Sequence, residues 1–179
     1  MIKRLYILLL LTLTSSICVA QHHVAMFYNV ENLFDTINCP TAADEDMLPL
    51  SDRRWNSERY NRKLSSISQV IQDISTQHTH PALIALAEVE NRTVLEDLIA
   101  QPALANAGYV ICHYDSPDER GIDVALLYRP DVFHLEGSRS IRHTAENPTR
   151  DILTAWGTLA DEQIFTAIVH WPSRIGGVE

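Results

Sequence analysis

Three polar side chains follow apolar, strand-like runs of the chain and could do chemistry together. Asn29, Glu88 and His170 each stand directly after such a run. Open sheets of α/β proteins present their reactive groups at the carboxyl ends of strands. An amide, a carboxylate and an imidazole at such an edge could hold a cation and contact a phosphoryl oxygen. The spacing therefore predicts a polar site at the edge of a sheet.

Glu88 carries the most specific expectation. It follows the six apolar residues 82–87, so its carboxylate emerges where a buried strand ends. An oxygen ligand on a rigid element suits a hard cation such as Mg²⁺ or Mn²⁺. The residues alone leave a second interpretation open, in which Glu88 is a surface acid at the start of the next helix.

Asn29, Glu31 and His170 each have a structural alternative. The Asn29 amide can hydrogen-bond a phosphate oxygen or orient a metal-bound water, but asparagine also forms turns at strand ends. Glu31, two residues later, is expected on the same face as Asn29. A single histidine such as His170 is ordinarily a packed or surface residue, and composition does not select it.

Four segments in one order carry a resemblance to a known family. They are N-V-E-N-L-F-D at 29–35, A-L-A-E-V-E-N at 85–91, R-G-I-D-V-A-L-L-Y-R-P at 120–130 and I-V-H-W-P-S-R at 168–174. Together they resemble the endonuclease/exonuclease/phosphatase family, the metal-dependent phosphoesterases that include DNase I-like nucleases and bacterial sphingomyelinases. The fourth segment has the form seen in secreted bacterial members.

The resemblance implies roles for the strand-end residues. Glu88 occupies the place of the family's metal-binding glutamate, with Ala87 where glutamine is frequent. Asn29 matches an asparagine near the metal, and Glu31 matches an acid found in part of the family. His170 matches a histidine that contacts the scissile phosphate. The implied cofactor is Mg²⁺ or Mn²⁺.

One further residue, Arg150, is assigned through the same resemblance, and Asp123 is a hypothesis based on the need of a charged histidine for an acidic partner. Arg150 resembles an arginine that binds substrate phosphate with its two-pronged guanidinium, and a solvated ion pair with Asp151 is the alternative. Asp123 is the candidate acid that would hold His170 in its charged form. After the metal-binding strand, Glu90 and Asn91 are expected to be a first-turn acid and a helix cap.

The implied function is a metal-dependent phosphodiester hydrolase, an extracytoplasmic endonuclease acting on nucleic acid. The formal charge of −9 means that nucleic-acid binding cannot depend on a global basic field, so a local cation must attract the substrate. Two alternatives remain at this point. One is a lipid or small-molecule phosphodiesterase or phosphatase on the same fold, and the other is a noncatalytic binding fragment.

The resemblance also implies residues that the sequence lacks. In the family an Asp-x-Asn motif and a closing Asp-His pair activate the attacking water, and neither follows His170. We therefore expect residues 21–179 to form a C-terminally truncated domain, inactive alone and missing a partner half.

The first twenty residues are expected to be a signal peptide. Lys3 and Arg4 precede the apolar stretch 5–13, and Cys18-Val19-Ala20 is a small-residue cleavage site. A membrane anchor or a lipoprotein centred on Cys18 is the weaker alternative, and downstream no apolar run reaches about eighteen residues. The expectation is cleavage after Ala20 and a secreted or periplasmic protein without a stable membrane anchor.

Hydrophobic periodicity predicts the elements that position these residues. An amphipathic pattern indicates a helix over 57–74, after a loop over 36–56, and a shorter helix over 92–100. Expected strands cover 24–29, 82–87, 109–114, 122–129, 132–141, 152–159 and 163–170. The fold class is α/β, a mixed sheet with flanking helices, which the resemblance extends to half of a four-layer α/β sandwich. Cys39 and Cys112 are expected to be two unrelated thiols.

Overall fold

A computed structural model describes residues 22–75, 79–142 and 149–171. The expected signal peptide lies outside these segments, and so does the end of the I-V-H-W-P-S-R motif, at 172–174. In chain order the elements are β1 (Ala25–Leu33), the 3₁₀ helix η1 (Glu45–Met47), α2 (Ser57–Ile74), β2 (Leu83–Val89), α3 (Arg92–Ile99), β3 (Val110–His113), β4 (Asp123–Tyr128), β5 (Phe133–Ile141), β6 (Ile152–Leu159) and β7 (Glu162–Ile168).

The strands form two sheets rather than the one that the sequence predicts. The first has the order β1-β2-β4-β3 and is mixed, because β1 and β2 run parallel while β4 is antiparallel to both of its neighbours. The second is the antiparallel meander β5-β6-β7. Between β6 and β7 lie only Ala160 and Asp161, both with positive φ, as in the tight turns that favour hairpins.

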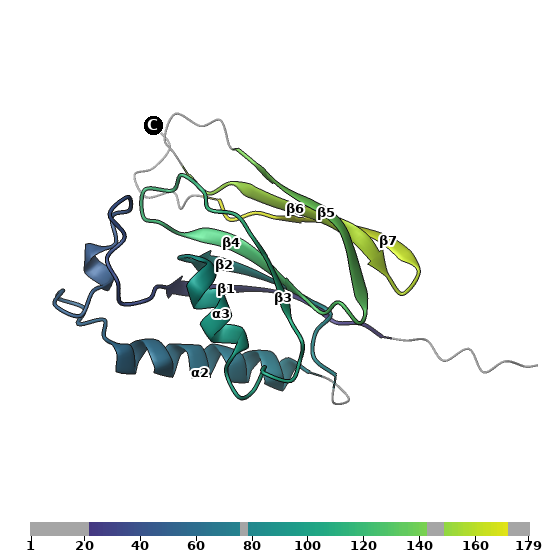
Figure 1. The fold of residues 1–179 in the computed structure, drawn as a ribbon, viewed down its shortest axis with the longest axis horizontal. Helices are drawn as coiled ribbons and strands as arrows, with labels where there is room; N and C mark the ends of the chain where they lie inside the picture. Colours follow the sequence, from purple (N-terminus) through teal and green to yellow (C-terminus); the bar gives the residue numbers. More distant parts are fainter. Residues whose placement is uncertain (1–21, 76–78, 143–148, 172–179) are drawn as a thin grey trace, which may run out of the picture.

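Two capped helices cover one face of the first sheet, and the second sheet covers the other (Figure 1). α2 begins at its predicted boundary, where the Asn56 side chain accepts a hydrogen bond from the backbone of Arg59. Its buried residues, Tyr60, Leu64 and Ile71 among them, recur every three or four positions and form the apolar stripe that faces the sheet. The layer order is therefore helix, sheet, sheet.

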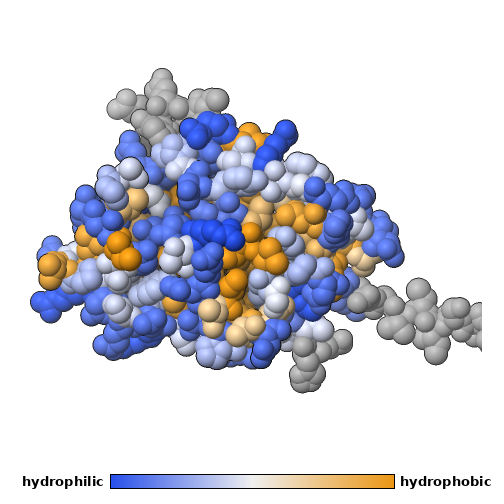
Figure 2. All heavy atoms as spheres, in the orientation of Figure 1, coloured by the Kyte–Doolittle hydropathy of each residue, from blue (hydrophilic) through white to orange (hydrophobic). Residues whose placement is uncertain are grey.

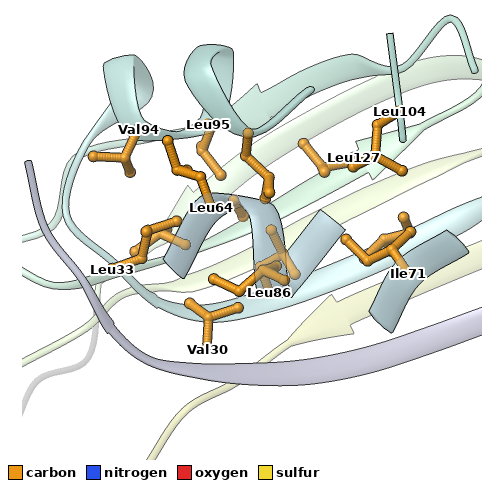
Figure 3. Packing of buried hydrophobic residues seen from close by; sticks show 14 of the residues in the cluster. Val30, Leu33, Leu64, Ile71, Leu86, Val94, Leu95, Leu104 and Leu127 are labelled. Atoms are coloured by element: carbon orange, nitrogen blue, oxygen red, sulfur yellow. The ribbon is translucent and has the colours of Figure 1, made fainter. Parts of the chain in front are cut away.

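Two apolar cores hold these layers together. The first lies between the helices and the first sheet, where Leu64 of α2, Leu95 of α3 and Leu86 of β2 pack together (Figure 3). The second lies between the sheets and contains Leu126 and Phe133. β2 is covered on both faces, which explains its nearly unbroken apolar sequence. The α/β class with a mixed sheet and flanking helices is confirmed.

The surface of the described segments is mixed. Figure 2 shows apolar side chains gathered across the middle of the face in view. Exposed large apolar side chains of the described residues include Val110 of β3 and Ile141 of β5. Within residues 22–75, 79–142 and 149–171, no helix has both the length and the apolar character needed to cross a bilayer.

Candidate phosphoesterase site

The strand ends that carry the candidate residues have a strained backbone. β1 and β2 pair regularly up to Asn29 and Ala87, and then the register shifts before Leu33 pairs with Val89. Within this double bulge Glu31, Asn32 and Glu88 all have φ between 56° and 64°. A left-handed conformation costs a non-glycine residue roughly 1–2 kcal/mol. Such strain concentrates at functional sites, where it aims a side chain that regular strand geometry would direct elsewhere.

The bulge brings the Glu88 carboxylate between Asn29 and His170. The Asn29 side-chain amide donates a hydrogen bond to Glu88 Oε1 at 3.2 Å, and His170 Nε2 lies 3.5 Å from the same oxygen. The side chains of Glu88 and His170 are 14% and 19% exposed. Three residues assigned from the sequence therefore meet at one edge. They come from β1, from β2 and from the segment just after β7.

The surroundings of His170 favour the neutral form of its imidazole. Burial lowers its pKa from the ordinary value of 6.5, and the nearby Arg150 adds to this, while Glu88 acts in the opposite direction. Its Nδ1 is buried and has no hydrogen-bond partner among the residues that the structure describes. A neutral imidazole with an unpaired nitrogen can bind a ligand or exchange a proton near neutral pH.

The structure corrects the expected partner of His170. The Asp123 carboxylate instead contacts His113 Nε2 at 3.0 Å and accepts a hydrogen bond from the backbone of Ser116 at 2.9 Å. The reason is topological. β3 pairs directly with β4, so His113 at the end of β3 lies beside Asp123 at the start of β4, whereas His170 follows a strand of the other sheet. The acid that faces His170 is Glu88.

The hydrogen-bond donors of Arg150 are engaged by other groups of the protein. Its guanidinium is buried and donates to the carbonyl oxygens of His170 and Trp171 and to the Asp118 carboxylate, the last at 2.8 Å. Asp151, the alternative partner, instead accepts from Ser140 and lies 3.0 Å from Arg142. Arg150 thus fixes the backbone that carries His170, and its contact with substrate phosphate stays a prediction.

Glu31 lies in the bulge, but its carboxylate is exposed and no ion pair or hydrogen bond links it to Glu88. Its backbone is tied down on both sides, because its N–H donates to Asn29 Oδ1 at 2.9 Å and its carbonyl accepts from Lys63 Nζ at 2.6 Å. The predicted metal contact of Glu31 stays a prediction.

Lys63 is a residue of this region that sequence patterns do not reveal. It lies on α2, 5.7 Å from the centre of the Trp55 ring, and the Trp55 indole donates to the carbonyl of Phe34 just after β1. Burial lowers the pKa of Lys63, while the charges of Glu31 and Glu88 oppose this. In the sequence, Lys63 is one of several polar residues on the helix and no motif marks it.

Of the two residues that follow β2, Asn91 has its predicted role and Glu90 does not. Asn91 caps α3 by accepting from the backbone of Val94 at 3.0 Å, as predicted. Glu90 was expected in the first turn but precedes the cap, where its buried carboxylate accepts from the backbone of Asp35 at 2.7 Å. Burial raises the pKa of Glu90 to about 7.

The donor set fits a hard divalent cation. The Glu88 Oε2 atom accepts no hydrogen bond from any residue in the described segments, while Oε1 is held by Asn29. A carboxylate with one oxygen oriented and the other available is suited to Mg²⁺ or Mn²⁺. The neighbouring Asn29 amide is neutral, so it orients the carboxylate without cancelling the charge of a cation.

An acidic pocket adjoins this edge. It has a volume of about 370 Å³ and is lined by Asp35, Glu90, Asp115, Asp118 and Asp123, together with residues of the 37–42 loop. Asp118 connects the pocket to the candidate site, because the same carboxylate binds the Arg150 guanidinium.

Comparisons with solved structures give low overall similarity. TDP2 from Caenorhabditis elegans is 16% identical with a TM-score of 0.45, over 63% of this chain and 31% of that one. The human Nocturnin catalytic domain with bound sulfate is 23% identical with a TM-score of 0.44, over 68% and 45%. An endonuclease/exonuclease/phosphatase family protein from Bacteroides thetaiotaomicron is 19% identical with a TM-score of 0.41, over 79% and 44%.

The chain therefore spans less than half the length of each of these three structures. A search of curated proteins found no match. The sequence model of one family, however, matches residues 24–179 and so covers most of the chain, including every candidate residue discussed above. This chain belongs to the Endonuclease/Exonuclease/phosphatase family.

Proposed function

We propose that this chain contributes the metal-binding part of a phosphodiester hydrolase that depends on Mg²⁺ or Mn²⁺, an endonuclease acting on nucleic acid outside the cytoplasm. Membership of the Endonuclease/Exonuclease/phosphatase family supports phosphoester hydrolysis. The observation that carries the proposal is the meeting of Glu88, Asn29 and His170 at a strained strand end, with one Glu88 oxygen available.

Each residue has a separate task in this proposal. Glu88 holds the divalent ion, and Asn29 fixes the rotamer of the Glu88 carboxylate through its 3.2 Å hydrogen bond. When bound, the ion would polarise a phosphoryl oxygen and neutralise developing negative charge. His170 donates a hydrogen bond to the phosphoryl group, and Arg150 keeps the His170 backbone in place.

The acidic charge of the chain supports a site that depends on a cation. With a formal charge of −9, the protein repels a polyanion at long range, so a bound divalent ion would supply the local attraction. Hydrolysis would further need residues that activate the attacking water, which the family resemblance implies.

The extracytoplasmic location rests on residues 1–20. Their basic start, apolar stretch and small-residue exit support export and cleavage after Ala20. Expression in a bacterial host followed by N-terminal sequencing of the periplasmic fraction tests this. A mature protein that begins at Gln21 supports export, and a protein that stays in the cytoplasm with Met1 intact contradicts it.

The test of function uses the protein produced from its full gene, with the 179-residue chain beside it. Both are incubated with plasmid DNA, RNA and phosphatidylcholine vesicles, in Mg²⁺ and in EDTA. We expect chelator-sensitive cleavage of nucleic acid by the full product, and its loss in Glu88→Gln and His170→Ala. If no phosphodiester is hydrolysed in a chelator-sensitive way, the enzyme proposal fails. Cleavage of the vesicle lipid alone would replace the nucleic-acid substrate by a lipid.

A further inference from the structure

A second group of metal-binding side chains lies at the same sheet edge and has no part in the proposed hydrolysis. It consists of His113 at the end of β3, Asp123 at the start of β4, and Asp115 in the connection between them. One ligand atom from each lies within 4.8 Å of the other two. We propose that this group is a transition-metal site, in which His113 Nδ1 and the Asp115 carboxylate bind an ion such as Zn²⁺ while Asp123 orients the imidazole.

The Asp123 carboxylate already holds the histidine in the orientation that metal binding requires. It lies 3.0 Å from His113 Nε2, and both side chains are almost fully buried, at 5% and 3% exposed. The backbone of Ser116 donates to the other Asp123 oxygen, so the carboxylate itself cannot rotate freely. Histidines that bind metals usually donate their second ring N–H to a carboxylate, which fixes the tautomer and leaves the other nitrogen as the ligand.

That other nitrogen has no competing partner. His113 Nδ1 makes no hydrogen bond with any residue in the described segments, and the nearest carboxylate atom, Asp115 Oδ1, is 3.9 Å away. This separation is too long for a hydrogen bond. Two atoms that each bind zinc at roughly 2.0–2.2 Å can be at most about 4.4 Å apart, so 3.9 Å is compatible with one shared ion.

The surroundings favour a divalent cation. The pocket beside the group is lined by Asp35, Glu90 and Asp118 as well as by Asp115 and Asp123, and none of its lining residues is a lysine or arginine. Imidazole and carboxylate together suit Zn²⁺, whereas Mg²⁺ and Ca²⁺ prefer oxygen ligands alone. Asp115 is 88% exposed, so its carboxylate can move onto the ion and water can fill the remaining coordination positions.

The experiment titrates the 179-residue chain with Zn²⁺ by isothermal calorimetry in a Glu88→Gln background, which removes the other histidine–carboxylate pair. Asp115→Asn is the test variant, because an exposed side chain can be changed without loss of folding, and circular dichroism verifies this. Asp46→Asn, another exposed aspartate, is the matched control. We expect Asp115→Asn to weaken Zn²⁺ binding at least tenfold and Asp46→Asn to leave it unchanged.

A second measurement identifies the nitrogen and the role of Asp123. In the chain labelled with ¹⁵N-histidine, Zn²⁺ should shift the Nδ1 resonance of His113 while Nε2 keeps its proton. Asp123→Asn should weaken Zn²⁺ binding about 10–100-fold, as loss of a carboxylate behind a metal-binding histidine does. Equal Zn²⁺ affinity in Asp115→Asn, or coordination at other histidines with no change at His113, would overturn the proposal. Neither outcome bears on Glu88, so the proposed hydrolase would still stand.

Discussion

Two histidine–carboxylate pairs lie at the same edge of the first sheet and differ in their packing. Glu88 and His170 come from different sheets, lie 3.5 Å apart and remain partly exposed. Asp123 and His113 come from adjacent strands of one sheet, lie 3.0 Å apart and are almost fully buried. In the tight pair both carboxylate oxygens are engaged and hold the imidazole in place, whereas in the loose pair one carboxylate oxygen accepts no hydrogen bond from the described residues.

The two pairs also differ in backbone strain, which is present at Glu88 and absent at Asp123. Glu88 has φ 63° within a double bulge, while Asp123 begins β4 and does not have positive φ. Proteins retain strained residues where a function selects for them and the surrounding packing compensates. The comparison therefore predicts that disturbing the Asp123 pair has the larger effect on stability, and that disturbing the Glu88 pair has the larger effect on binding of the proposed Mg²⁺ or Mn²⁺ ion.

The largest expected effect is on stability, at the tight pair. Asp123→Ala removes the partner of a buried histidine and the acceptor of the Ser116 backbone, so the free energy of unfolding should fall by about 3 kcal/mol. Urea denaturation measures this, with Asp46→Ala as the exposed control. A loss below about 1 kcal/mol would show that the Asp123 pair is not the more structural of the two.

The next effect is a pH dependence of stability, and it arises from Glu90, which belongs to neither pair. Burial raises the pKa of Glu90 from 4.5 to about 7, so between these values the folded state binds more protons than the unfolded state. Stability should therefore fall as the pH rises from about 4.5 through 7. In EDTA, the loss of Tm from pH 5 to pH 8 should be smaller in Glu90→Gln than in the wild type. An equal loss in both would refute this origin.

A smaller effect is expected at the residue that holds the bulge near the loose pair. Lys63→Met removes the donor to the Glu31 carbonyl and the contact with Trp55, which together should cost about 1 kcal/mol of stability. Amide exchange in residues 29–33 should accelerate. Arg62→Met, a neighbour on the exposed side of α2, is the control and should change neither quantity by a comparable amount. An unchanged rate of amide exchange in Lys63→Met would show that Lys63 does not stabilise the bulge.

The smallest effect is expected at Glu88. Glu88→Gly relieves a left-handed conformation that costs roughly 1 kcal/mol and loses a hydrogen bond from Asn29 of about the same value. The free energy of unfolding should therefore stay within about 1 kcal/mol of the wild type. A loss as large as that of Asp123→Ala would remove the contrast between the two pairs.

Local patterns in the sequence predict the elements well and their pairing poorly. The period of apolar residues predicts α2 at Ser57–Ile74, and the apolar run before Glu88 predicts β2. The partner of Asp123 is a matter of which strands pair. Since hydrophobic alternation is the same whichever neighbour a strand has, the sequence could not show that β3 would place His113 there.

The sequence also could not predict the division into two sheets or the contacts of Lys63, because both depend on tertiary packing. Strands β5 to β7 have ordinary strand patterns, and their separation from β4 depends on packing between layers rather than on any local signal. Lys63 lies on the polar side of an amphipathic helix. Its contact with the Glu31 carbonyl depends on a bulge that no sequence pattern predicts.

The most direct measurement is an electron paramagnetic resonance titration of the 179-residue chain with Mn²⁺, comparing the wild type, Glu88→Gln and Asp123→Asn. The account predicts that the wild type binds Mn²⁺, that Glu88→Gln weakens this binding at least tenfold, and that Asp123→Asn retains it. Equal Mn²⁺ affinity in the wild type and Glu88→Gln would contradict the proposal that Glu88 is a metal ligand.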